Sequence, residues 1–240
     1  MALILACFSA ISSATVGHVK VFVQQSVAGA STVETFNTSA TNINDAVCVQ
    51  IAAAATTLPA SATLTAPGWT FTQISSFTTW PATAVASVFC GISPNTASVT
   101  FTATFTGGSG FTAISILGDE FSGNETIGGT STFEATNSAT AASGSPTVSV
   151  TPISNNDGLW AACQDSVSAI LAGFTKGADD TQGDWTEWKI LSGQAGTPQT
   201  VSFTGGPGYI IQTIAIRALP IRASLAMKGN VKLKGNAKIK

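Results

Sequence analysis

The sequence predicts an all-β fold, an antiparallel β-sandwich of jelly-roll-like or immunoglobulin-like type built from two internally similar halves. Residues 98–105 alternate apolar and hydroxyl side chains, which is the period of a strand with one buried face. The heptapeptide Phe-Thr-Gly-Gly-Ser-Gly-Phe at 105–111 recurs as Phe-Thr-Gly-Gly-Pro-Gly-Tyr at 203–209. No dozen residues carry the i, i+3, i+4, i+7 apolar pattern, so low helix content is expected.

The first half reads as short strands separated by turns. Residues 1–10 are apolar, but no Lys or Arg precedes Lys20, so a first strand is expected there rather than a signal peptide. The further expected strands are residues 18–24, 32–36, 46–51, 69–74, 84–92, 98–105 and 111–117. No apolar run approaches the roughly 18 residues of a bilayer span, so no membrane span is expected.

Each glycine-rich heptapeptide is expected to close a β-hairpin. Its three glycines tolerate the positive φ angles that a tight reversal requires. The apolar run that follows each copy has the composition of a return strand near the middle of a sheet. The heptapeptide therefore predicts a strand pair that is used twice.

The second half repeats the features of the first in the same order. The matched features are Asn42–Asp45 with Asn155–Asp157, Pro67–Thr70 with Gly183–Thr186, and the two heptapeptides. The middle match makes Trp185 the expected counterpart of Trp69, both as core residues. The predicted organisation is a first half at 1–124, a Thr/Ser/Gly-rich connection at 125–146, a second half at 147–221 and a basic tail at 222–240.

Charge is scarce and unevenly distributed. Charged residues make up 9% of the chain, against about 25% in an average protein. Two explanations remain open: a surface largely covered by neighbouring subunits, or a secreted sandwich with a Thr/Ser-coated exterior. Residues 1–220 hold twelve acids and four bases, a net of −8, whereas residues 221–240 hold six bases and no acid, a net of +6. The acidic body disfavours specific nucleic-acid binding.

The tail repeats Lys-Gly-Asn with a spacing of six residues, beginning at Lys228 and again at Lys234. Lysines alternate with apolar residues inside each unit, as in short amphipathic strands that could add to the sheet of a neighbouring subunit. The candidate partner-binding residues are Lys228, Lys232, Lys234, Lys238 and Lys240. The alternative is a solvated basic tail, because two such units cannot fold alone.

The cysteines and the titratable residues indicate little chemistry. Cys7, Cys48, Cys90 and Cys163 lie in apolar contexts without metal-ligand spacing and are expected to be small buried side chains rather than a disulfide pair. The single histidine, His18, is expected at the surface, and no GxSxG motif presents a serine. No catalytic residue, metal site or cofactor is therefore predicted.

Two acid clusters could have suggested chemistry. Asp119 and Glu120 are adjacent in an expected strand, so they should point to opposite faces and not converge on a glycosidic bond. Asp179, Asp180 and Asp184 could hold calcium, but they lack EF-hand spacing and are interpreted as solvated loop charge.

Tryptophans offer the main route to ligand binding. Trp185 and Trp188 are three residues apart and should face opposite sides of one strand. An exposed indole can stack on the apolar face of a sugar ring. Both residues are therefore candidates for glycan stacking.

Several short motifs together resemble a known β-sandwich module. They are an Asn-Asp turn before an apolar strand, Ala66–Thr70, Ser98–Phe101, and Ile114–Leu117 leading to Glu120–Gly123. This series is similar to a module of bacteriophage structural proteins and of bacterial secreted or surface proteins, over about residues 18–219. The resemblance implies a sandwich used for display or attachment, without shared catalytic residues.

The expected function is that of a non-enzymatic virion structural protein, such as a phage capsid decoration, head-fibre or tail component. Its expected partners are other copies of itself and neighbouring virion proteins, and its expected location is the virion. The basic tail and the resemblance favour this reading. The alternative is a carbohydrate-binding or adhesive module that is extracellular or at a bacterial surface, with a cell-surface glycan as its partner.

Overall fold

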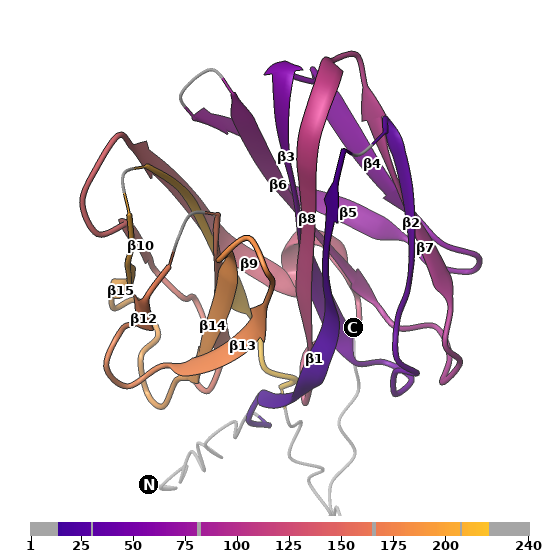
Figure 1. Cartoon of the computed structure of the whole chain (residues 1–240). Helices are drawn as coiled ribbons and strands as arrows, with labels where there is room; N and C mark the ends of the chain where they lie inside the picture. Colours follow the sequence, from indigo (N-terminus) through magenta and orange to yellow (C-terminus); the bar gives the residue numbers. More distant parts are fainter. Residues whose placement is uncertain (1–13, 30, 81–82, 165–166, 207, 221–240) are drawn as a thin grey trace, which may run out of the picture.

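A computed structural model describes residues 14–29, 31–80, 83–164, 167–206 and 208–220 (Figure 1). The prediction of an all-β antiparallel fold is confirmed. Sixteen strands and one short 3₁₀ turn, η1 (Gly129–Ser131), form the regular structure of this part of the chain. Among the same residues, no helix is long and apolar enough to cross a membrane.

The first half forms a five-stranded and a three-stranded sheet. Its strands are β1 (Gly17–Ala28), β2 (Val33–Asn37), β3 (Ala46–Thr57), β4 (Ser61–Thr65), β5 (Phe71–Trp80), β6 (Ala84–Ile92), β7 (Thr100–Thr106) and β8 (Ser109–Ser122). The larger sheet has the order β1-β8-β3-β6-β5, and the smaller one has the order β2-β7-β4.

The second half repeats this arrangement strand for strand. Its strands are β9 (Phe133–Ala141), β10 (Thr147–Val150), β11 (Gly158–Gln164), β12 (Ala169–Ile170), β13 (Thr175–Asp179), β14 (Trp185–Ile190), β15 (Gln199–Thr204) and β16 (Tyr209–Ile216). The sheet orders are β9-β16-β11-β14-β13 and β10-β15-β12, so each strand has its counterpart eight strands later. The two halves are therefore topological duplicates.

The strand pairing identifies each half as a jelly roll. Pairs β1–β8, β2–β7 and β3–β6 are nested one inside the next, as in a long hairpin that has been rolled up. The second half nests β9–β16, β10–β15 and β11–β14 in the same way. In each half, the fifth strand pairs with the sixth in the larger sheet. The topology thus favours the jelly-roll over the immunoglobulin alternative.

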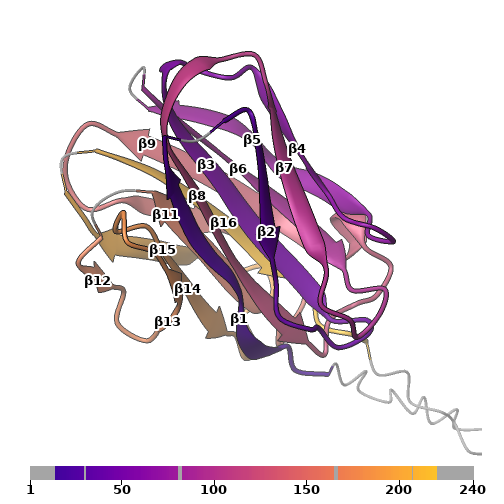
Figure 2. The same cartoon turned by 45° about the vertical axis from the view of Figure 1, so that its right-hand side comes forward.

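The four sheets stack as layers with three hydrophobic cores between them. One core fills the first half, around Phe101 and Ile51, and another fills the second half, around Phe203 and Ile211. The third core, around Phe121 and Trp160, draws side chains from both halves. The two large sheets therefore face each other across a shared core, here called the seam, and the three-stranded sheets lie outside (Figures 1 and 2).

Contacts across the seam follow a pseudo-twofold relation. Strand β1 lies against β13, and β5 lies against β9. Because β9 is the counterpart of β1 and β13 is the counterpart of β5, exchanging the two halves converts one contact into the other. Strands β8 with β14 and β16 with β6 obey the same exchange. Within one chain, the halves are consequently arranged as the two subunits of a symmetric dimer would be.

The glycine-rich heptapeptides do reverse the chain, but the predicted hairpins are wrong. Strands β7 and β8 belong to different sheets, as do β15 and β16, so each turn is a corner between the two layers of a sandwich. Gly107, Gly108 and Gly110 all have positive φ. A Cβ at Gly108 would lie 2.9 Å from the Pro59 nitrogen, so the turn packs tightly against the loop between β3 and β4.

Two further expectations need correction. Residues 125–146, expected to be a connection, contain β9, an edge strand that pairs with β16. Trp69 also has a different counterpart from the predicted Trp185, because Trp185 begins β14, whereas Trp69 precedes β5. Its counterpart is Phe174: the Trp69 amide bonds to Ala66 O, as the Phe174 amide bonds to Leu171 O. Trp69 itself is a core residue, as expected.

The cysteines also differ from expectation. Cys48 on β3 and Cys90 on β6 are directly opposite each other and form a disulfide. Both are fully buried, as predicted, but the pairing depends on a strand register that the local sequence does not show. Cys163 is buried on β11, and Cys7 lies outside the described residues. The first strand expected at residues 1–10 and the basic tail also lie outside them.

Candidate functional site

The centre of the seam is a buried carboxylate, Asp119 on β8. Its Oδ2 accepts hydrogen bonds from Trp160 Nε1 at 2.8 Å and from Thr186 Oγ1 at 2.5 Å, both in the second half. Its Oδ1 lies 2.8 Å from His18 Nε2 on β1. Asp119 is fully buried. One carboxylate thus joins β1 and β8 of the first half to β11 and β14 of the second.

Local sequence makes room for this contact. A Cβ at Gly177 on β13 would come within 2.6 Å of both carboxylate oxygens of Asp119, so only glycine lets the strand pass over it. The Thr186 hydroxyl also accepts a hydrogen bond from the Ala178 amide at 2.6 Å. The Ala178 amide of β13 thus orients the Thr186 hydroxyl of β14, which donates to the Asp119 carboxylate. Such hydrogen bonds offset the cost of burying the charge.

The expectation of a surface position for His18 is wrong. Its side chain is 13% exposed, and its ring stacks on Trp188 with centroids 4.6 Å apart and planes inclined by 6°. The hydroxyl in this cluster, Thr186 Oγ1, donates to Asp119 and not to the imidazole. In a catalytic triad, the imidazole would accept a hydrogen bond from the hydroxyl. Here the hydroxyl and the imidazole both bond to the Asp119 carboxylate, so the cluster has the contacts of a structural link.

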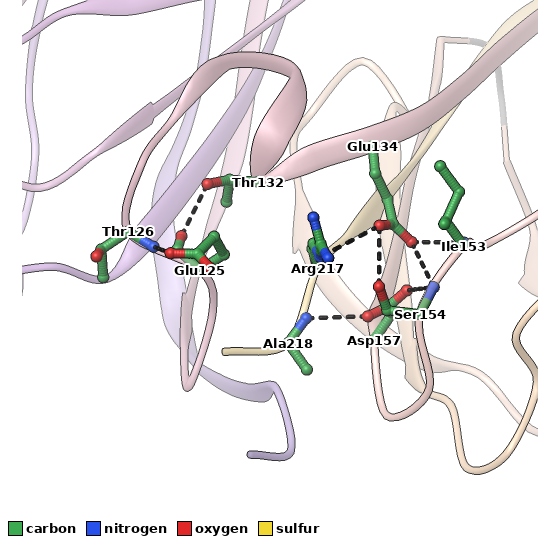
Figure 3. Close-up of polar contacts among 9 residues, drawn as sticks. All are labelled: Glu125, Thr126, Thr132, Glu134, Ile153, Ser154, Asp157, Arg217 and Ala218. Carbon is green, nitrogen blue, oxygen red and sulfur yellow. Dashed lines mark hydrogen bonds and ion pairs between the residues drawn. The ribbon is translucent and has the colours of Figure 1, made fainter. Parts of the chain in front are cut away.

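A second acidic cluster lies where β9 and β16 reach the turn before β11 (Figure 3). Glu134 Oε1 accepts hydrogen bonds from the amides of Ile153 at 2.6 Å and Ser154 at 2.9 Å. Asp157 Oδ1 accepts one from the Ala218 amide at 2.9 Å. Arg217 Nε lies 3.8 Å from Glu134 Oε2. These carboxylates hold the turn at Ser154 to the end of β16.

The environment of Asp157 favours its protonated form. Burial and, to a smaller extent, the neighbouring Glu134 carboxyl together raise its pKa from 3.8 to about 8, against the opposing effect of the Ala218 amide. Asp157 is fully buried. It therefore holds a proton at neutral pH, which lets two carboxyl groups lie side by side.

The first half has an equivalent cluster with a different distribution of residues. Asp45, the counterpart of Asp157, accepts a hydrogen bond from Asn42 Nδ2 at 3.0 Å. Its neighbour is Glu120, which binds the Asn42 amide at 2.7 Å and has Lys20 Nζ at 3.3 Å. Burial raises the pKa of Asp45 to about 6, while the Asn42 hydrogen bond lowers it. As expected, the adjacent residues Asp119 and Glu120 engage different partners.

Glu187 is a buried acid inside the second jelly roll. Its Oε2 accepts a hydrogen bond from the Leu171 amide at 3.0 Å, and its Oε1 is buried without a hydrogen-bond partner among the described residues. Burial raises its pKa to about 7. Its first-half counterpart, by strand register, is Phe89, so an apolar position has become polar in the second half.

The loop acids considered for calcium are used differently. Asp179 pairs with Lys176 at 2.8 Å. Asp180 accepts hydrogen bonds from Ser115 Oγ at 2.6 Å and from the Gln182 and Asp184 amides at 2.9 and 3.1 Å. In the part of the chain that the structure describes, no three His, Cys, Asp or Glu side chains are grouped to hold a metal ion.

Trp185 and Trp188 lie on opposite faces of β14, as predicted. Trp185 packs against the core of the second half and carries Lys176 Nζ 3.5 Å from its ring centroid. Trp188 contributes to the seam and stacks on His18. A protein group thus contacts each ring, Lys176 on Trp185 and His18 on Trp188. The lysines proposed for partner binding, 228 to 240, lie outside the described residues.

Sequence reasoning missed the roles of Asp119, Glu187 and Trp80. A charged residue inside an apolar run, such as Asp119 after Ile114–Leu117, is a signal of a buried acid that must find donors. The same signal applies to Glu187 between two tryptophans. Trp80, at the end of β5, lines a pocket at the seam and has no comparable local signal.

Searches against protein-family models, curated proteins and solved structures found no match for this chain. The buried ionisable groups described above hold strands, turns and halves together. The lining of the pocket at Trp80 includes an aromatic ring and a buried polar atom that has no hydrogen-bond partner among the described residues.

Proposed function

We propose that this chain is a non-enzymatic structural protein of a virion, a capsid decoration, head-fibre or tail component of a bacteriophage, which acts through contacts between subunits. The observation that carries the proposal is the use of its buried titratable groups. His18 and Asp119 join the two jelly rolls across the seam, and the acids beside the turns hold each turn within its own half. They are not gathered around an open cleft.

The fold is compatible with this role. Jelly rolls occur in viral capsid proteins and also in lectins. The fold by analogy therefore supports a role in assembly or in recognition, and it does not distinguish between the two. The resemblance to phage structural modules and the basic tail add to the assembly reading. The tail's charge of +6 opposes the −8 of residues 1–220, so it could contact an acidic surface of another copy.

The outward faces of the small sheets support subunit docking. In the first half this face is a grid of hydroxyl side chains in which Thr35, Thr102 and Thr65 are in register across three strands. In the second half Thr147 and Ser149 face Ser202 and Thr200, with side-chain oxygens 3.0 and 3.1 Å apart. Such surfaces can be covered by a neighbour without desolvating charge, which suits the core of an interface.

The buried disulfide supports an external location. Disulfides persist in oxidising surroundings and are uncommon in the reducing cytosol. A protein with Cys48 and Cys90 joined is suited to the outside of a particle or of a cell. The disulfide suits a virion protein and equally a secreted or surface-attached protein.

The test compares the full chain with a variant lacking residues 223–240. A second variant, with Lys228, Lys232, Lys234, Lys238 and Lys240 changed to Gln, retains the length of the tail and removes five of its six positive charges. Sedimentation measures association, and mass spectrometry of purified particles measures incorporation. We expect both variants to lose association, and the full chain to lose it as salt is added. A full chain that remains monomeric and absent from particles would contradict the proposal.

A further inference from the structure

A pocket of about 210 Å³ opens at one end of the seam. Its lining comes from both halves: Ala54, Trp80, Ala84, Ala113 and Ser115 from the first, and Gln164, Gln182, Asp184, Gly208 and Ile210 from the second. Pockets for drug-sized ligands measure roughly 300–1,000 Å³. The space therefore suits one ring-sized group and not an extended ligand.

One wall of the pocket is apolar and rigid. Trp80, at the end of β5, packs with Ala84 and Ile210. Its ring lies directly against Gly208, where a Cβ would overlap it, so glycine is required for the second heptapeptide to approach the indole. These contacts restrict the ring before a ligand binds, which lowers the entropy cost of ordering it against a stacking partner.

The same lining carries polar atoms. Gln164 Oε1 is buried and has no hydrogen-bond partner in the described part of the chain. An acceptor left in this condition costs about 1–3 kcal/mol unless a ligand or water donates to it. Gln182 is an exposed residue of the same lining and offers an amide that both donates and accepts. The Ser115 hydroxyl donates to Asp180 and is already occupied.

We propose that this pocket binds a single neutral sugar ring, with the apolar face of the ring stacked on Trp80 and a hydroxyl donating to Gln164 Oε1. A sugar ring presents C–H groups on one face and hydroxyls around its edge, which matches an indole wall beside glutamine side chains. The site lies away from Trp185 and Trp188. It does not depend on the assembly role, because an attachment protein of any kind could use it.

Other ligand classes fit less well. Among the described residues that line the pocket there is no Lys, Arg or His, so an anion would lack a counter-charge. A quaternary ammonium would favour several aromatic rings around it, and Trp80 is the single aromatic residue of the described lining. A neutral, hydroxyl-bearing ring uses both the indole and the unpartnered acceptor.

The test is saturation-transfer NMR on the full chain with glucose, galactose, mannose and N-acetylglucosamine, each at millimolar concentration. At least one of these sugars should receive saturation. Gln164→Leu should lower the affinity for that sugar at least tenfold, and Trp80→Ala should abolish its saturation-transfer signal. Gln199→Leu, on β15 and outside the pocket lining, should bind as the wild type does.

Stability measurements keep the test decisive. Gln164→Leu removes a buried acceptor without a partner, so its melting temperature should equal or exceed that of the wild type. Loss of binding in a folded Gln164→Leu protein would then reflect the missing oxygen. The proposal is overturned if none of the four sugars binds, if Gln164→Leu and Trp80→Ala bind as the wild type does, or if tetramethylammonium displaces the sugar.

Discussion

The two halves share one strand order but fill an equivalent position in the seam differently. In the first half, Cys48 and Cys90 are opposite each other on β3 and β6 and form a disulfide. In the second half, the same pair of positions on β11 and β14 holds Trp160 and Trp188. A covalent link on one sheet thus corresponds to two large indoles on the other. The two halves therefore keep the same strand order and alternation although different residues occupy an equivalent cross-strand pair.

Removing the disulfide should have the largest effect on this comparison. The double variant Cys48→Ala/Cys90→Ala opens a loop with a sequence separation of 42. By chain entropy it should lose about 4 kcal/mol in the free energy of unfolding. Urea denaturation measures the loss, and wild-type protein under reducing conditions is the matched comparison. An unchanged unfolding midpoint would show that the disulfide adds nothing to a seam already held by the tryptophans.

Asp119→Ala should weaken the contact between the halves. The variant leaves Trp160 Nε1 and Thr186 Oγ1 buried without their acceptor, at a cost of about 3 kcal/mol in total. Asp179→Ala, which removes an exposed acid, should change stability by less than about 0.5 kcal/mol. Thermal and urea unfolding report both values. Equal stability of the two variants would mean that the seam does not depend on this carboxylate.

The acidic clusters predict an unusual pH dependence. The pKa of Asp157 is raised from 3.8 to about 8 in the folded state, so the folded protein keeps a proton that the unfolded chain has lost between these values. Its stabilising contribution is complete below about pH 4 and is lost as the pH rises to about 8. The slope contributed by one proton is at most about 1.4 kcal/mol per pH unit.

Asp157→Asn tests this dependence because the amide cannot titrate. Between pH 5 and pH 8, within the window set by the shifted pKa, its stability should fall less steeply than that of the wild type. Asp179→Asn, at an exposed position, should retain the wild-type slope. Denaturant unfolding at several pH values supplies the comparison. Parallel curves for Asp157→Asn and wild type would refute the assignment of the proton to this residue.

The smallest expected effect concerns a buried amide bridge across the seam. Gln50 Nε2 donates to Gln212 Oε1 at 3.0 Å, and Gln212 Nε2 donates to Ser75 Oγ at 2.7 Å. By strand register their counterparts in the other halves are Ala162 and Leu117.

Gln50→Ala and Gln212→Leu each introduce the residue found at the equivalent position of the other half. Each should cost about 1 kcal/mol alone, because a buried amide loses its partner. The double variant should cost less than the sum of the two, by about 1 kcal/mol of coupling. Additive losses in this double-mutant cycle would show that the two amides act independently.

The sequence predicted most strands because alternating or continuous apolar residues report directly on burial. Residues 98–105 and 84–92 are strands β7 and β6 within one or two residues of the expected bounds. The glycine turns were placed correctly and interpreted wrongly, because a positive φ permits a reversal but does not specify which sheet receives the next strand. That choice is made by the nested pairing of strands far apart in the chain.

Strand β9 could not be recognised from its side chains. Most of Phe133–Ala141 is polar or small, since β9 is an edge strand held mainly by backbone hydrogen bonds to β16. The disulfide and the Asp119 cluster escaped prediction for a related reason. Both depend on which residues of distant strands are opposite each other, and such register is a property of the folded sheets.

The seam occupies the apolar face through which a single jelly roll would otherwise pair with a copy of itself. Under the proposed assembly role, the surfaces of the body left for contact with neighbours are the two hydroxyl-covered sheets, which lie on opposite sides of the molecule. A unit with two similar, oppositely directed faces extends into rows or layers more readily than it closes into a pair. Because those faces carry no strong charge, contacts between them would depend on shape and hydrogen bonds, and the salt dependence of association would come from the basic tail.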